Sequence, residues 1–184
     1  SDVCSSDLEE QLIKNWADIL FNNNKGIDRL NGQPLTKGEM QQLLDKVKEL
    51  RTPLALNGFI NGKSVTITRD NPADKLHFGK DVSLTIYNRL EIASGKSFYQ
   101  IARQPKFEHH SFILPKRRGD LVLLINGMPV IHIELKSSKV PAMHAVNQIT
   151  DKYIPEGVFT DSIFSLVQIF VAMNPEEMMY FANP

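Results

Sequence analysis

Residues 119–136 read GDLVLLINGMPVIHIELK, and this stretch decides the fold. Two apolar, β-branched runs flank an Asn-Gly pair, which is the pattern that most strongly predicts a short β-hairpin. Asp120 stands at the outer end of the first run, and Glu134 and Lys136 stand at the outer end of the second. Because successive side chains of a strand point to opposite faces, Glu134 and Lys136 share one face.

The geometry of the turn decides whether Asp120 joins that face. A two-residue turn at Asn126-Gly127 pairs Asp120 with Ile133, so that Asp120 faces away from Glu134. A three-residue turn or one β-bulge shifts the register by one residue and brings Asp120 onto the face of Glu134. If the three charged residues work together, the hairpin must contain the odd-length turn or a bulge.

Two carboxylates and a lysine at the open end of a buried hairpin suit phosphodiester chemistry. A hard divalent cation takes carboxylate oxygens, and Mg²⁺ uses one or two of them together with waters and phosphate oxygens. A lysine beside the cation can position the attacking water or offset charge on the phosphate. The alternative is a surface hairpin with ordinary charges at its rim, and the thirteen-residue gap between Asp120 and Glu134 does not exclude it.

The arrangement Asp120…Glu134-Leu135-Lys136 resembles the Asp…(Asp/Glu)-x-Lys core of the PD-(D/E)xK nucleases. Longer stretches of the sequence around this arrangement resemble the N-terminal nuclease domain of the R subunit of type I restriction enzymes. That resemblance rests on residues 117–138, 145–153 and 157–184, and it extends upstream through 88–107 and 31–40.

The resemblance implies a Mg-dependent type I site-specific deoxyribonuclease. Asp120 and Glu134 would ligate Mg²⁺, for which Mn²⁺ could substitute, with the backbone carbonyl of Leu135 as a third ligand. Lys136 would handle the water or the charge of the transition state. Many such nucleases also carry a glutamate on their first helix that reaches the metal, and Glu9 is the candidate here, ahead of its neighbour. A solvated carboxylate at a helix start is the alternative for Glu9.

The RecB-like branch of these nucleases carries a Gln-x-x-x-Tyr motif on the helix after the lysine. Gln148 and Tyr153 match this motif with one extra residue between them. Residues i and i+5 of a regular helix diverge by roughly 140°. Gln148 is therefore expected to orient DNA or Lys136, whereas Tyr153 belongs to the site only if the helix is locally distorted, and is otherwise a core aromatic.

Composition bounds how this chain could bind DNA. The formal net charge is zero, so DNA contact must be local or must come from other domains. Lys116, Arg117 and Arg118 precede Asp120 and Lys139 follows Lys136, so both basic groups flank the expected metal ligands. Phosphate contact is expected of them, although solvated loops are the alternative.

The resemblance also implies the partners. These are double-stranded DNA, motor domains of the same subunit that use ATP, and the modification and specificity subunits, all in the cytoplasm of a bacterium or archaeon. No run of eighteen apolar residues predicts a membrane helix, and no secretory signal is visible. Two alternatives stay open: a nuclease-like domain that only binds DNA or docks on another subunit, and a repair or junction nuclease.

The expected fold class is α/β, with a mixed central sheet flanked by helices, as in the PD-(D/E)xK restriction-endonuclease-like core. Residues 8–184 are expected to form a single nuclease domain, as part of a larger subunit, after a disordered end or cloning remnant over 1–7. Periodicity and turn signals predict helices over 8–21, 40–50 and 141–154, a hairpin over 59–67, and strands over 82–87, 97–107, 165–173 and 179–182.

Three other patterns are set aside. Two Gly-Lys-Ser sequences, at 62–64 and 95–97, lack the upstream glycine that a phosphate-binding loop needs. Residues 108–110 read Glu-His-His, and because adjacent histidines of an extended segment point opposite ways, an exposed loop is expected rather than a metal site. His132 shares the face of Glu134 but is expected to be a packed core histidine.

Overall fold

The computed structural model describes residues 2–3, 8–50, 52–60, 64–87, 94–95, 97–103, 106–107, 117–118, 120–160 and 162–184. The chain forms two compact units: Ser1–Leu12 together with Phe98–Pro184, and Ile13–Ser97. The division falls inside helix α1 (Leu8–Asn24). Every residue expected at the active site belongs to the first unit, which is called the sheet unit below, and the second is called the helical unit.

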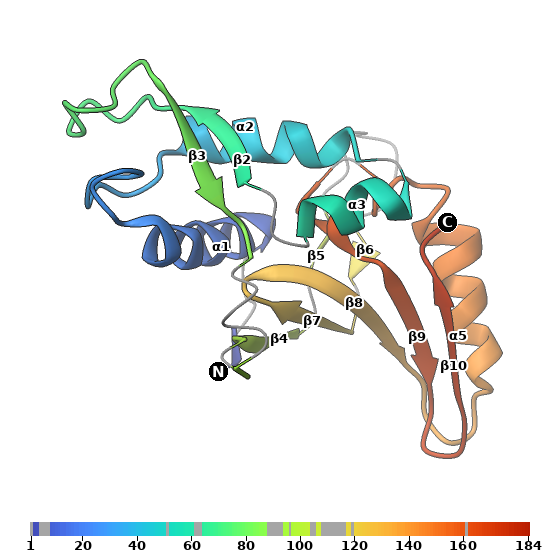
Figure 1. Ribbon diagram of the computed structural model, residues 1–184. Coiled ribbons are helices and arrows are strands. Elements are labelled where there is room, and N and C mark those ends of the chain that lie inside the picture. The colour runs from blue at the N-terminus through green and yellow to red at the C-terminus, as the bar shows by residue number, and fades with distance from the viewer. Residues whose placement is uncertain are drawn as a thin grey trace. The chain divides into compact units, whose positions relative to one another are not determined.

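The sheet unit is built on a mixed sheet centred on the 119–136 hairpin, which confirms the predicted fold class (Figure 1). The described strands follow the order β1-β4-β7-β8-β9-β10, in which β1–β4 and β8–β9 are parallel and the other pairs antiparallel. Their bounds are β1 Asp2–Val3, β4 Tyr99–Arg103, β7 Leu121–Ile125, β8 Met128–Leu135, β9 Ile169–Met173 and β10 Met178–Ala182. A separate short pair joins β5 (Lys106–Phe107) to β6 (Arg117–Arg118).

The two faces of this sheet differ in burial. One face carries His132, Glu134, Phe170 and Ala172 from the two parallel central strands, and all four are buried. The opposite face carries apolar side chains that are at least one third exposed, namely Tyr99, Ile101, Leu135, Ile169, Met178 and Tyr180. The buried face therefore holds both the core of the unit and the residues expected at the site.

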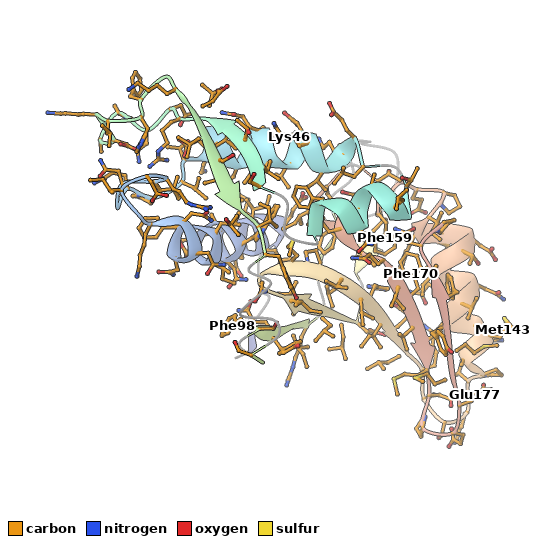
Figure 2. The ribbon with its side chains drawn as sticks, in the orientation of Figure 1. Lys46, Phe98, Met143, Phe159, Phe170 and Glu177 are labelled. Carbon is orange, nitrogen blue, oxygen red and sulfur yellow. The ribbon has the colours of Figure 1, made fainter. Side chains whose placement is uncertain are left out.

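Helix α5 (Ala142–Gln148) lies along β9 and β10 in Figure 1 and continues into a π-helical turn at Ile149–Tyr153. Pro141 precedes α5 and gives it no side-chain cap. Glu177 of the β9–β10 turn replaces the cap, because its Oε1 accepts the Ala142 amide at 2.7 Å. Figure 2 labels Glu177 at this turn and Met143 in the first turn of α5. The turn thus fixes the start of the helix that carries Gln148.

The helical unit contains the rest of α1, then α2 (Lys37–Lys48), α3 (Pro53–Ile60) and the antiparallel pair of β2 (Ser64–Thr68) with β3 (Asp81–Thr85). Helix α2 begins with a capping box, in which Thr36 accepts the Glu39 amide at 3.1 Å and Glu39 accepts the Thr36 amide at 3.0 Å. This cap follows from the pattern Thr-x-x-Glu in the sequence.

A fully buried arginine organises the core of the helical unit. Arg69 bonds Glu39 at 2.6 Å and Asp74 at 3.0 Å, and all three side chains are excluded from solvent. The same guanidinium donates to the carbonyls of Leu30 and Gln33. Because every charge has a partner, the cluster avoids the large cost of an isolated buried ion.

The structure corrects two element predictions and adds one helix. The hairpin expected over 59–67 is wrong: Phe59 lies in helix α3, and β2 pairs with β3 instead. Helix α3, which was not predicted from the sequence, opens at Pro53, where the missing N–H costs nothing, and Thr52 accepts the Ala55 amide. The strand expected over 165–173 begins only at Ile169, because Ser162 caps a 3₁₀ turn over Ile163–Leu166.

Two further expectations concern the ends and the membrane. Residues 1–7 were expected to be disordered, but Asp2–Val3 pair with β4 as strand β1. Strand β4 pairs with β7 on one side, so backbone N–H and C=O groups on its other side can bond β1. The remaining residues of 1–7, and residues 62–63, 96 and 108–110, lie outside the described residues. Within the described ranges, no helix has the length and apolar character needed to cross a membrane.

Candidate active site

The central hairpin combines a two-residue turn with a β-bulge. Ile125 pairs with Met128 across the turn, where Asn126 and Gly127 adopt φ of 50° and 80°. These positive φ values are those of a type I′ turn, which Asn-Gly favours. The register then shifts between Leu123 and Leu124, because Leu124 pairs with Pro129 whereas Leu123 pairs with Ile131. Val130 is therefore the extra residue of a bulge.

The bulge brings Asp120 to Glu134, and the predicted irregularity of the hairpin is confirmed. Leu121 pairs with Ile133, so the register continues to Asp120 opposite Glu134. The Leu135 amide donates to Asp120 Oδ2 at 2.7 Å, which ties the two strands together beyond their last paired residues. The carbonyl of Val130 is not left unpaired, because it accepts the Gln168 amide at 2.9 Å.

Glu134 lies at the centre of the polar contacts on this face. Its side chain is almost fully buried, and burial of a carboxylate is unfavourable unless donors surround it. Gln148 Nε2 donates to its Oε1 at 2.6 Å, and the Tyr153 hydroxyl lies 3.4 Å from the same oxygen. His132 Nε2 lies 3.2 Å from Oε2, and Lys136 Nζ lies 3.8 Å from Oε1. Glu134 is thus the shared partner of the expected site residues.

The helix after the hairpin is distorted where the sequence required it. The five residues Ile149–Tyr153 form a π-helical turn, in which the Ile154 amide donates to the Ile149 carbonyl at 2.9 Å. A π turn holds one more residue than an α turn, so residues i and i+5 come onto one side. Gln148 accordingly donates to the Tyr153 hydroxyl as well as to Glu134. The extra residue in the motif is absorbed by the π turn.

Lys136 is held by the same glutamine. Lys136 Nζ donates to Gln148 Oε1 at 2.7 Å, while Gln148 Nε2 faces Glu134. A glutamine side chain offers one acceptor oxygen and two donor hydrogens, so it can hold a cation and a carboxylate together. The ammonium of Lys136 is partly exposed, with 22% of its side chain accessible, and it can therefore meet a bound molecule.

Tyr153 stays neutral over the physiological pH range. Burial raises the pKa of its hydroxyl to about 12, and the negative charge of Glu134 adds to the effect. A neutral phenol keeps its hydrogen and can donate it to Glu134 Oε1. Tyr153 is therefore both a core aromatic, as one interpretation of the sequence expected, and a member of the hydrogen-bond network.

The remaining expected residues lie as follows. Leu135 contacts Asp120 through its backbone amide, and its carbonyl stays a predicted metal ligand. Glu9, in the first turn of α1, accepts the Ile163 amide at 3.4 Å, and its role at a metal stays a prediction. Lys139 is exposed in the turn after β8. Lys116 and the side chains of Arg117 and Arg118 lie outside the described parts of the structure.

Sequence reasoning assigned His132 to the core and missed its polar contact. The side chain is fully buried, as expected of a packed histidine. Its Nε2 nevertheless faces Glu134 Oε2, a contact that period-two spacing of His132 and Glu134 on one strand made possible. The shared face was the available signal, but a sequence does not give the direction of a buried ring.

Comparison with known proteins places the chain in a family. The sequence family described as Type I restriction enzyme R protein N terminus matches residues 5–184. The type I restriction enzyme SauCOLORF180P endonuclease subunit of Staphylococcus aureus is 32% identical over 178 residues, which are 95% of this chain and 17% of that subunit. The EcoprrI endonuclease subunit of Escherichia coli is 40% identical over 67 residues, which are 36% of this chain and 21% of that protein.

A third relative, the SsaAORF53P endonuclease subunit of Staphylococcus saprophyticus, is 31% identical over 95% of this chain and 17% of its own length. The chain thus spans about a sixth of the length of these staphylococcal relatives. The match covers the bulged hairpin, the π turn and the helical unit alike. This chain belongs to the family of N-terminal regions of type I restriction enzyme R proteins.

Proposed function

We propose that this chain is a metal-dependent endonuclease domain that cleaves DNA phosphodiester bonds within a type I restriction enzyme. The observation that carries the proposal is that two separate irregularities converge on one carboxylate. The bulge brings Asp120 to Glu134, and the π turn brings Tyr153 to Gln148 and Glu134. Neither irregularity is needed to fold a hairpin or a helix, so their meeting at the same group supports a functional site.

The donor set suits a hard cation. Asp120 and Glu134 supply carboxylate oxygens, and the Leu135 carbonyl is the proposed third ligand. Among the described residues, no group of three or more His, Cys, Asp or Glu side chains gathers to enclose an ion. Mg²⁺ fits such a set because it keeps several waters and takes phosphate oxygens from its substrate, and Mn²⁺ accepts the same ligands.

When bound, the cation would lower the pKa of a ligated water and polarise the phosphodiester. The residues of the chain do the remaining work. Lys136, oriented by Gln148, offsets negative charge on the phosphate or positions the water. Tyr153 donates to Glu134 and keeps its carboxylate in place. Asp120 is fixed through one oxygen by the Leu135 amide, so its orientation does not depend on the cation.

DNA binding is proposed to be local and shared. The chain has no net charge, so Lys139 and the basic residues at 116–118 would contact phosphates on either side of the site. The proposed partners are double-stranded DNA, ATP-using motor domains of the same subunit, and the modification and specificity subunits, in the cytoplasm of a bacterium or archaeon. Since the relatives carry names of type I restriction enzymes, restriction is favoured over DNA repair.

The test uses the complete subunit, assembled with its modification and specificity subunits, with unmodified plasmid, ATP and Mg²⁺. Asp120→Asn and Lys136→Met should each lower cleavage by about 100-fold or more. ATP hydrolysis should be unchanged, because the motor lies outside this chain. Glu176→Gln and Lys152→Met, which alter exposed residues of the same unit, are the matched controls and should cut normally. Normal cleavage by both site variants would contradict the proposal and favour a non-catalytic DNA-binding or docking domain.

A further inference from the structure

The two oxygens of Glu134 are held by different groups. Oε1 accepts from Gln148 at 2.6 Å and faces the Tyr153 hydroxyl, whereas Oε2 faces His132 Nε2 at 3.2 Å. Gln148 and Tyr153 come from the helix, and His132 comes from the same strand as Glu134. The carboxylate is therefore held from both sides, and His132 contacts the Oε2 side.

Packing fixes the ring of His132. Its centroid lies 5.8 Å from that of Tyr153, 5.3 Å from that of Phe159 and 6.2 Å from that of Phe170, with interplanar angles of 78°, 58° and 75°. Phe159 and Phe170 also pack on each other at 4.7 Å, and Figure 2 shows these two labelled rings as neighbours. Side chains in a close-packed interior hold single rotamers, so the direction of Nε2 is set by its aromatic surroundings.

The imidazole of His132 is a polar group buried among aromatic rings. Burying a hydrogen-bonding group among aromatic rings is unfavourable unless a partner compensates it, and an apolar side chain would fill the same space at lower cost. Glu134, the residue proposed to hold the cation, faces His132 Nε2 in this pocket. An ionised carboxylate only accepts hydrogen bonds, so a hydrogen bond to ionised Glu134 requires the tautomer of His132 that carries its hydrogen on Nε2.

We propose that His132 is a positioning residue whose Nε2–H fixes the rotation of the Glu134 carboxylate and thereby prepares it for a divalent cation. The proposal rests on the proposed function, because it assumes that Glu134 is a ligand. Donors behind a metal-binding carboxylate hold it in the geometry that the ion needs, and their loss typically lowers metal affinity or activity by about 10–100-fold.

The test compares two replacements of nearly equal length and shape. Glutamine can place an amide N–H close to the position of Nε2, whereas methionine fills the same volume without a donor. The probe is Mn²⁺ alone, titrated without ATP into the assembled enzyme, with free Mn²⁺ measured by electron paramagnetic resonance. An Asp120→Asn enzyme identifies the part of the binding that belongs to this site. Intact ATP hydrolysis and thermal unfolding show that each variant is folded.

His132→Met should weaken Mn²⁺ binding at this site by about 10–100-fold, and His132→Gln should restore most of it. Plasmid cleavage by His132→Met should recover at high Mn²⁺ concentration, because the defect lies in holding the ion. Phe181→Leu is the packing control, since Phe181 contacts Phe170 and lies one ring further from His132. It should lower the unfolding temperature and leave Mn²⁺ affinity unchanged.

Three results would overturn this assignment. Wild-type affinity in His132→Met would show that the donor is not needed, and equal losses in His132→Gln and His132→Met would show that shape alone matters. A comparable loss in Phe181→Leu would show a general packing effect. If His132→Met does not fold, His132→Leu takes its place in the same comparison with His132→Gln. Mn²⁺ binding that survives Asp120→Asn is a different failure, because it would contradict the proposed metal site itself.

Discussion

At the scale of single residues, the site depends on the chemistry of one amide. Gln148 accepts from Lys136 through its oxygen and donates to Glu134 through its nitrogen. No other uncharged side chain of this length offers both functions at its tip. The amide keeps the ammonium 3.8 Å from the carboxylate, which is longer than a direct hydrogen bond. Lys136 thus lies near Glu134 without forming a direct hydrogen-bonded ion pair with it.

Replacing this amide by a carboxylate should disable the site. In Gln148→Glu a second carboxylate would lie within hydrogen-bond reach of Glu134. Two carboxylates this close do not both stay ionised, so one takes up a proton and Lys136 pairs with the other. Plasmid cleavage by the assembled enzyme should fall by roughly 10–100-fold.

The control for this change is Asn147→Asp, which adds the same charge at the neighbouring, exposed position of the same helix. It should cut at the normal rate. If Asn147→Asp lowers cleavage as strongly as Gln148→Glu, the loss comes from the charge of the helix and the bridging role of Gln148 is contradicted.

At the scale of elements, two irregular segments place the site residues. The sequence predicted the hairpin, and it also predicted that either an odd-length turn or a bulge must be present if Asp120 and Glu134 share a face. It could not say which, because Asn126-Gly127 suits a type I′ turn and also a bulged one. Position 130 holds valine, whose side chain gives no signal of a bulge. The amide of Gln168, the residue directly before β9, is what satisfies the carbonyl of the bulged residue.

The π turn gives a sharp prediction about chain length. It absorbs one residue beyond the regular spacing of a Gln-x-x-x-Tyr motif. Deleting Asp151, which is exposed, should convert the turn to α-helix and leave Gln148 and Tyr153 adjacent, because residues i and i+4 lie on one face. Inserting one alanine after Asp151 should separate them and abolish cleavage.

Both variants should be measured for plasmid cleavage and ATP hydrolysis in the assembled enzyme. The prediction is that the deletion keeps substantial cleavage and the insertion does not. If the deletion is as inactive as the insertion, the π turn has a role beyond bringing Gln148 and Tyr153 together, and the account of this element is wrong.

At the scale of the whole molecule, the family match spans both units, whereas the candidate site residues do not. All described candidate site residues belong to the sheet unit, whereas the helical unit is organised by the buried cluster around Arg69. Although burial opposes ionisation of Asp74, hydrogen bonds from Arg69, Asn31 and His77 lower its pKa to about 2. The cluster is therefore a source of stability that depends on Asp74 being ionised.

The helical unit should lose stability in acid for this reason. The pKa of Asp74 is lower in the folded chain, at about 2, than its ordinary value of 3.8, so its contribution is present above pH 4 and is lost as the pH falls toward 2. The loss should amount to about 2 kcal/mol in the free energy of unfolding. Asp74→Asn should be less stable at pH 5 and should show a flatter dependence on pH.

Urea unfolding at pH 5 and pH 2.5 measures this, followed by the fluorescence of Trp16, which is the single tryptophan and is fully buried in the helical unit. Asp45→Asn is the control, since Asp45 is exposed and pairs loosely with Lys48 at 3.9 Å. An unchanged acid dependence in Asp74→Asn would contradict the stabilising role of the cluster.

The sequence predicted the sheet unit better than the helical unit, and the reason is physical. Glu134 and Lys136 share a face through strand alternation, which the sequence displays directly, and the sequence reduces the placement of Asp120 to one question, whether the hairpin is irregular. Tertiary folding brings Arg69 to its partners Glu39 and Asp74, so no local sequence pattern predicts these contacts. Helix α3 was missed although Thr52-Pro53 carries the signals of a helix start, because the apolar run after it also suits a strand.

The central claim is that the bulge and the π turn build one divalent-metal site between Asp120 and Glu134. The most direct measurement is a crystal structure of the chain with Mn²⁺, using anomalous scattering to locate the ion. We expect an anomalous peak bound by carboxylate oxygens of Asp120 and Glu134, and no such peak in Asp120→Asn. An ion bound elsewhere in the wild type, or none at these two residues, would contradict it.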